Sequence, residues 1–101
     1  MVMVGIAAPA FGEAFSVNGV VQAIASGTPQ GPALRAYVRN GEIDVLDRCE
    51  ENYAYVADLA DGYITSGQRI TDSYYSGKPV TLSIDKDEAG WCRIISVDPT
   101  S

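Results

Sequence analysis

The segment LRAYVRNGEIDVLDRCEENYAYV, residues Leu34–Val56, has the sequence pattern that predicts local structure most clearly in this chain. At its centre, Asn40-Gly41 separates two runs in which apolar and polar residues alternate. A two-residue hairpin loop of type I′ needs a positive φ at both loop residues, and Asn and Gly adopt that conformation at little cost. The segment therefore predicts an antiparallel hairpin that turns at Asn40-Gly41, with Leu34–Arg39 paired to Glu42–Leu46.

A two-residue loop also fixes which residues of the two strands face each other. The expected pairs are Arg39 with Glu42, Val38 with Ile43, Tyr37 with Asp44 and Ala36 with Val45. Side chains alternate between the two faces of a sheet, so the apolar members of these pairs share one face, and charged residues and Tyr37 share the other. We expect the first face to pack in the core and the second to be exposed to solvent.

Length and composition predict one small globular domain. The chain has 101 residues, of which 47% are hydrophobic and 20% are charged, which argues against disorder. Thirteen acidic residues against seven basic ones give a net charge of −6 and a sequence pI of about 4.3. Because the basic residues are few and scattered, nucleic acid is excluded as a partner.

The N-terminal segment, residues 1–14, is apolar but too short to span a bilayer, so no membrane span is predicted. Gly12 and Ala14 are spaced like the small residues before a signal-peptide cleavage site, although no basic residue precedes Arg35. We interpret the segment either as the end of a signal peptide, which predicts a periplasmic or secreted protein, or as an arm that packs in the core or joins two copies into a homo-oligomer. In the second case a cytoplasmic location remains open. Residues 15–101 then form a single small β domain.

Two further stretches flank the central hairpin. Phe15–Ser26 alternates in a way that favours a strand, and Gly27–Pro32 contains two prolines and two glycines, which predicts a loop. At the C-terminal end, Val80–Ile84 and Trp91–Val97 alternate on either side of an acidic tip, which predicts a second hairpin with Val80, Leu82 and Ile84 facing the core. Thr65–Pro79 is polar and contains breakers, so we expect a loop there with at most one turn of helix.

The segment at 48–60 fits two structures. Asp47 and Glu50 form a capping pattern, and Tyr53, Val56, Ala57 and Ala60 follow at helical spacing, which predicts an amphipathic helix. Tyr53–Val56 also alternates as a strand, and Asp61-Gly62 suits a turn after it.

A family resemblance bears on this choice. Ser26-Gly27-Thr28-Pro29, Ile43–Leu46, Tyr53–Val56, Asp61–Ile64 and Ile70 together resemble the loop and strand motifs of bacterial SH3 domains over about half of the chain. The resemblance implies a mainly β fold, a small SH3-like barrel, here with an added C-terminal hairpin. The alternative is an α+β fold with one helix at 48–60. That helix would be similar to the opening helix of the Rap1a/Tai immunity proteins, on the residues Cys49, Tyr55–Ala57 and Asp61–Tyr63, and would imply a toxin-blocking role.

The sequence contains little that points to a catalytic site. The chain has no histidine, which removes the usual general base and the usual metal ligand. Acidic pairs such as Asp44 with Asp47, or Asp58 with Asp61, are expected by chance at this composition, and the calcium-loop pattern that starts at Asp85 has Ala89 and Ser96 where ligands are needed. We therefore expect no enzyme, no catalytic residue, no cofactor and no metal.

The tyrosines are the better candidates for function. Tyr37, Tyr53, Tyr55 and Tyr63 are expected at the wet side or rim of the barrel, where rigid amphipathic rings suit the recognition of a peptide or a cell-wall glycan. The alternative is that these rings pack in the core. We predict a non-catalytic binding module, and the alternative is a protein that works by self-association or by blocking a toxin.

Cys49 and Cys92 are the only two cysteines. An even pair in a small exported chain is expected to form a disulfide, whereas in a reducing cytosol two buried free thiols are expected.

Overall fold

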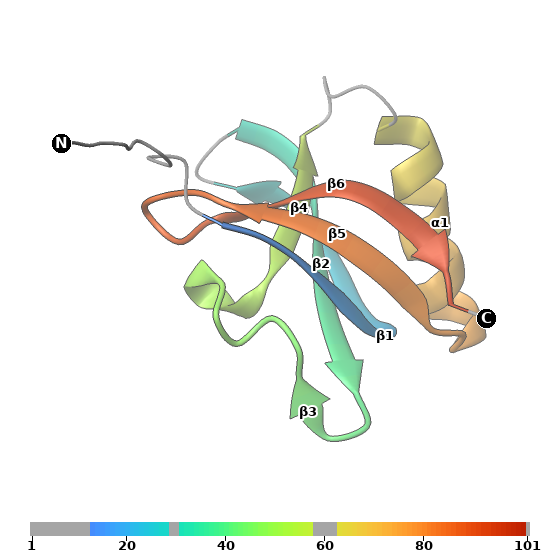
Figure 1. Ribbon diagram of the computed structural model, residues 1–101. Helices are drawn as coiled ribbons and strands as arrows, with labels where there is room; N and C mark the ends of the chain where they lie inside the picture. The colour runs from blue at the N-terminus through green and yellow to red at the C-terminus, as the bar shows by residue number, and fades with distance from the viewer. Residues whose placement is uncertain (1–12, 29–30, 58–62, 101) are drawn as a thin grey trace, which may run out of the picture.

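The computed structural model describes residues 13–28, 31–57 and 63–100. The fold is mainly β, with one α-helix beside a curled sheet (Figure 1). The strands are β1 (Glu13–Thr28), β2 (Gly31–Asn40), β3 (Ile43–Asp44), β4 (Ala54–Ala57), β5 (Val80–Lys86) and β6 (Cys92–Pro99), and the helix is α1 (Tyr63–Ser76). No helix in this described part of the chain is long and apolar enough to cross a membrane.

The six strands form one mixed sheet in the order β1-β5-β6-β4-β2-β3. Every neighbouring pair is antiparallel except β4 and β6, which run parallel. In addition, β1 pairs with both β5 and β2, because its first half (Glu13–Gly19) lies along β5 and its second half (Val20–Thr28) lies along β2. The pairings therefore lead from β1 through β5, β6, β4 and β2 back to β1.

Strand β1 changes partner at Gly19. A Cβ atom at this position would lie 2.6 Å from the carbonyl oxygen of Arg39, so only glycine allows β2 to come this close. Immediately after it, the pairing with β2 is irregular between Val21 and Ala23. The backbone N–H of Val21 donates instead to the hydroxyl of Ser73 in α1 (3.1 Å), and that hydroxyl donates to the carbonyl of Lys78 (2.7 Å).

The predicted strand at Phe15–Ser26 lies within β1, but the loop expected at Gly27–Pro32 is shorter than predicted. Thr28 and Gly31 face each other as a pair, and residues 29–30 lie outside the described part of the chain. Gly27 (φ 88°) and Gly31 (φ 113°) supply the left-handed backbone on either side of this loop. Of the N-terminal segment, only Glu13 and Ala14 are described, at the start of β1.

The central hairpin forms, but its predicted register is wrong. The loop is Gly41-Glu42, because Asn40 pairs with Ile43 and Arg39 with Asp44. Gly41 has a φ of 64°, and Glu42 does not have a positive φ. A type II′ turn needs a positive φ only at its first loop residue, and this loop fits that type. A shift of two residues leaves the two face groups unchanged, yet it carries Ile43 beyond the core, where its side chain is 67% exposed.

Two other expectations for helical and loop regions are also wrong. Of the two structures considered for 48–60, the strand at Tyr53–Val56 is confirmed by β4, and the helix is wrong in the described residues. A 3-10 turn at Glu50–Asn52 precedes β4, since Glu51 and Asn52 adopt left-handed backbone (φ 56° and 60°) that ends a helix. The predicted loop at Thr65–Pro79 is α1 for most of its length. Its buried positions Ser66, Ile70 and Ser73 keep helical spacing.

The C-terminal hairpin and the core-facing residues of β5 are confirmed. Strands β5 and β6 pair antiparallel, with Leu82 opposite Val97 and Ile84 opposite Ile94, and the side chains of Val80, Leu82 and Ile84 are buried. The main core joins them to the inner face of β2 and β4 and to α1, and burying each such large apolar side chain contributes roughly 1.5–3 kcal/mol. Its buried residues are Val21, Ala36, Val38, Leu46, Cys49, Ala54, Val56, Ile70, Val80, Leu82, Ile84, Cys92, Ile94 and Val97.

Candidate functional site

Aromatic side chains gather on the sheet face opposite the main core. On β2, Ala36 and Val38 point into the core, so the alternating Tyr37 points to the other face. Tyr55 of β4 and the preceding Tyr53 share that face for the same reason. The rings of Tyr37 and Tyr53 have their centroids 5.7 Å apart, and Trp91, just before β6, follows at 5.9 Å from Tyr53. We call Tyr37, Tyr53, Tyr55 and Trp91 the aromatic surface.

The members of this surface differ in exposure. Tyr53 is 1% exposed and Tyr55 is 8% exposed, whereas Tyr37 and Trp91 are half-buried. The expectation of exposed rings is therefore wrong for Tyr53 and Tyr55. The ring of Tyr53 is in contact with those of Tyr37 and Trp91. Tyr53 forms the floor of the surface, and Tyr37 and Trp91 form its two flanks.

A row of polar residues crosses the same face beside the rings. The pairing registers set Arg35 of β2 opposite Tyr55 of β4, Tyr55 beside Arg93 of β6, and Arg93 opposite Asp85 of β5. The guanidinium of Arg93 pairs with the Asp85 carboxylate at 3.3 Å. The guanidinium of Arg35 lies 5.4 Å from the centre of the Tyr53 ring, and its Nε is buried without a hydrogen-bond partner in the described structure.

The loop between β5 and β6 holds Trp91 in place. One carboxylate oxygen of Asp87 accepts hydrogen bonds from the backbone N–H groups of Ala89 and Trp91, both at 2.9 Å. Gly90, at φ 98°, completes the loop, and its carbonyl accepts a hydrogen bond of 2.7 Å from the backbone N–H of Glu50. Asp87 is thus a positioning residue for the indole ring.

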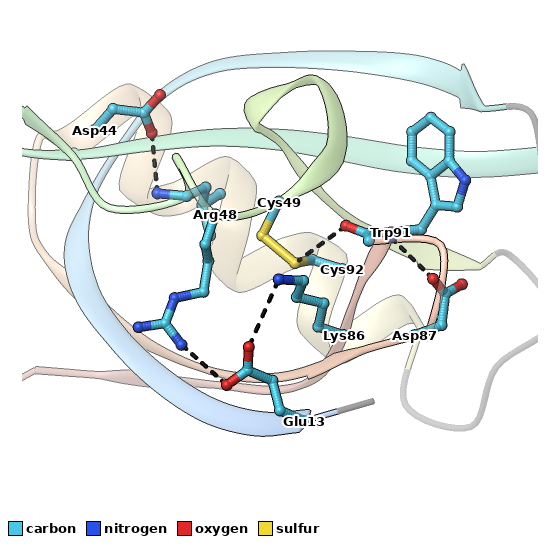
Figure 2. Close-up of a disulfide and its surroundings, with 10 residues drawn as sticks. Glu13, Asp44, Arg48, Cys49, Lys86, Asp87, Trp91 and Cys92 are labelled. Carbon is cyan, nitrogen blue, oxygen red and sulfur yellow. Dashed lines mark hydrogen bonds and ion pairs between the residues drawn. A yellow bond between two sulfur atoms is a disulfide. The ribbon is translucent and has the colours of Figure 1, made fainter. Parts of the chain in front are cut away.

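A disulfide between Cys49 and Cys92 supports the same region (Figure 2). Cys49 precedes the turn that leads to Tyr53, and Cys92 follows Trp91 directly. The bond therefore fastens the segments that carry Tyr53 and Trp91, and its two cysteines are 43 residues apart in sequence. Both cysteines are buried in the main core.

A shallow depression of about 570 Å³ opens beside the surface. Tyr55 and Trp91 provide aromatic walls, and Asp85, Asp87, Glu88 and Arg93 provide charges. The Tyr55 hydroxyl has no hydrogen-bond partner in the described structure. Burial raises the pKa of Tyr55 above its ordinary value of 10.0; Arg93 opposes this rise, and Asp87 and Asp85 add to it. The hydroxyl therefore stays neutral at physiological pH and is able to donate or accept a hydrogen bond.

The four tyrosines predicted as one site do not all come together. Tyr63 begins α1, packs against the main core and lines a separate depression with Leu34 and Ile64. Sequence analysis missed Trp91, Arg35 and Arg93. A tryptophan directly after the glycine of a hairpin tip is a usable signal for the first. The two arginines flank Tyr55 only through the pairing of β2 with β4 and of β4 with β6, which no local pattern predicts.

The acidic pairs do not form a site in the described structure. The carboxylate of Asp44 accepts hydrogen bonds from the backbone of Leu46 (2.9 Å) and from the side chain of Asn52 (3.0 Å), which is a structural role. Asp58 and Asp61 lie outside the described residues. Within residues 13–28, 31–57 and 63–100, no group of three or more Cys, Asp or Glu side chains is placed to hold a metal ion.

Comparison of the chain with family models, with curated proteins and with solved structures found no match.

Proposed function

We propose that this chain is a non-catalytic binding domain, which captures a peptide or a cell-wall glycan on the aromatic surface. The observation that carries the proposal is the set of ring contacts among Tyr37, Tyr53 and Trp91 beside a depression that Tyr55 and Trp91 line. Rings of this kind offer a large rigid contact area at a small cost in conformational entropy, and the hydroxyl adds directional recognition.

The topology supports this proposal. We infer that β1, β5, β6, β4 and β2 close into a small barrel, since their pairings return to β1. A helix between β4 and β5 and a parallel β4–β6 pair favour the oligonucleotide/oligosaccharide-binding type of five-stranded barrel over the SH3-like type. Barrels of that type bind ligands on the face of their second and third strands, which here are β2 and β4. The net charge of −6 argues against an oligonucleotide as the ligand.

An exported location is consistent with a domain that binds a peptide or a cell-wall glycan. The disulfide between Cys49 and Cys92 supports an oxidising compartment such as the periplasm or the cell exterior. Intact mass under denaturing, non-reducing conditions tests this on protein recovered from its native compartment. We expect no alkylation of either cysteine before reduction, and alkylation of both would contradict the exported location.

The binding proposal is tested with a panel of peptides and glycan oligomers, because Trp91 is the only tryptophan and its fluorescence reports on the site directly. We expect at least one ligand to shift the emission, and Trp91→Phe or Tyr37→Ala to weaken that ligand's affinity measured by calorimetry. The matched control is Tyr75→Ala, which removes a ring that is 77% exposed on α1. Equal loss in the control and the site variants would contradict the proposal.

Self-association is a second candidate, favoured by apolar exposure near the start of β1. Ile95 of β6 is 53% exposed beside a shallow depression that Phe15 and Ile84 also line. Sedimentation of the chain with and without residues 1–12 tests it. A monomer in both forms removes this candidate. A toxin-blocking role stays a prediction from sequence similarity, and no observation in the structure favours it.

A further inference from the structure

We propose that the depression between Tyr55 and Trp91 receives the cationic side chain of a basic peptide segment, a lysine ammonium or an arginine guanidinium. This inference rests on the proposed function and names the class of ligand for the same surface.

The charges around the depression are negative on balance. Asp85, Asp87 and Glu88 contribute three carboxylates, against the single guanidinium of Arg93. Arg93 is already paired with Asp85, so it neutralises one carboxylate and is not available to attract an anion. Asp87 uses one oxygen for the backbone of the loop, and exposed Glu88 has no partner in the described structure. Two carboxylates therefore remain to attract a cation.

The walls suit a cation as well. A cation placed over the face of an indole or a phenol ring is attracted by the ring quadrupole, and tryptophan is the best of these partners. The same sheet face already holds one such contact within the chain, because the guanidinium of Arg35 lies over Tyr53. Trp91 and Tyr55 offer the next aromatic positions beside it, with the carboxylates at their edge.

The Tyr55 hydroxyl supplies the directional contact. Tyr55 is 8% exposed, it lines the depression, and its oxygen has no partner in the described structure. The hydroxyl is not among the buried polar atoms that lack a partner in the described structure, so it stays accessible and is able to accept a hydrogen bond from a bound N–H group. The chain's net charge of −6 adds long-range attraction for a basic peptide and repulsion for an acidic one.

Titration of the oxidised full chain with N-acetyl-hexalysine amide tests the inference, with hexaglutamate and chitohexaose as comparison probes. We expect hexalysine to shift Trp91 fluorescence, its affinity to fall as NaCl is added, and hexaglutamate to give no shift. Glu88→Gln is expected to weaken hexalysine binding about two- to fivefold. Trp91→Ala, whose affinity is measured by calorimetry because it lacks the only tryptophan, is expected to weaken it about tenfold.

The matched control is Glu42→Gln, in the loop of the central hairpin, which changes the net charge by the same amount away from the depression. Equal weakening by Glu88→Gln and Glu42→Gln would mean that only net charge matters, and it would overturn the inference. Binding of chitohexaose without binding of hexalysine would overturn the cationic ligand but leave the proposed function standing. Binding of neither probe overturns the inference, while the proposed function is then decided by the wider panel of peptides and glycans.

Discussion

At the residue scale, Tyr53 links stability to the candidate site. Its ring is 1% exposed, contacts Tyr37 and Trp91, and lies under the guanidinium of Arg35. Removing it would leave a cavity beneath the whole aromatic surface. A loss of binding in a Tyr53 variant therefore does not identify a ligand contact, whereas a loss in a variant of half-buried Tyr37 does.

Tyr53→Ala is expected to lower the free energy of unfolding by about 3–5 kcal/mol, as for other buried aromatic residues. Urea unfolding followed by circular dichroism measures the loss. Tyr53→Phe is the matched control, because it keeps the ring. A loss below about 1 kcal/mol for Tyr53→Ala would show that the ring is not buried.

The same tyrosine predicts a dependence of stability on alkaline pH. Burial raises the pKa of Tyr53 above 10.0, with a smaller contribution from the charge of Glu51. Above pH 10.0 the unfolded chain releases this proton while the folded chain retains it, so the free energy of unfolding falls as the pH rises from the unfolded to the folded pKa. We expect a fall above pH 10 that is smaller in Tyr53→Phe. An identical fall in the two proteins would contradict the assignment.

At the scale of elements, α1 shows what sequence patterns could and could not predict. The buried positions Ser66, Ile70 and Ser73 keep helical spacing, but two of the three are serines, so the apolar period is absent. Ser73 is buried because it serves the irregular part of β1, a contact 52 residues away. In contrast, β5 and β6 were predictable, since their alternation and turn lie within one short stretch.

The central hairpin shows the same division between local and distant causes. Its two face groups follow from the alternation of side chains, which is a property of the sequence. Its register does not, because β2 also pairs with β1 through Arg39 and with β4 through Ala36, and Gly41 can serve the loop from either position. The aromatic surface combines both cases: the position of Tyr37 on the face opposite Val38 was predictable, and its meeting with Trp91 was not.

Ser73→Ala tests the link between α1 and β1. The substitution leaves the buried N–H of Val21 and the carbonyl of Lys78 without their partner, at a cost of about 1–3 kcal/mol for the group left buried. We expect a lower urea midpoint for Ser73→Ala. Gln68→Ala, at an exposed position of the same helix, is the control and should change little. Equal effects would mean that the hydroxyl bridge contributes nothing.

At the scale of the whole molecule, the disulfide joins the middle of the chain to its last strand. A closed loop of this length stabilises a domain by about 4 kcal/mol in the chain-entropy model. That is a large share of the roughly 5–15 kcal/mol that a small domain has. The bond also fastens the segments that carry Tyr53 and Trp91, so we expect stability and the proposed binding to depend on it together.

Reduction is therefore expected to lower the free energy of unfolding by about 4 kcal/mol, and to move the fluorescence of Trp91 toward that of an exposed indole. Urea unfolding with and without a phosphine reductant measures both quantities. The double variant Cys49→Ser, Cys92→Ser separates loss of the bond from effects of the reductant, because it should not respond to reduction. Equal stability of the oxidised and reduced chains would contradict the structural role of the bond.

The central claim is that ligand binds on the outer face of β2 and β4 beside Trp91. Amide chemical shifts of isotope-labelled protein, recorded during titration with a ligand from the panel, test it most directly. The account predicts the largest shifts at residues 35–37, 53–55 and 85–93. Shifts concentrated on α1 or around Phe15 and Ile95, with the aromatic surface unchanged, would contradict it.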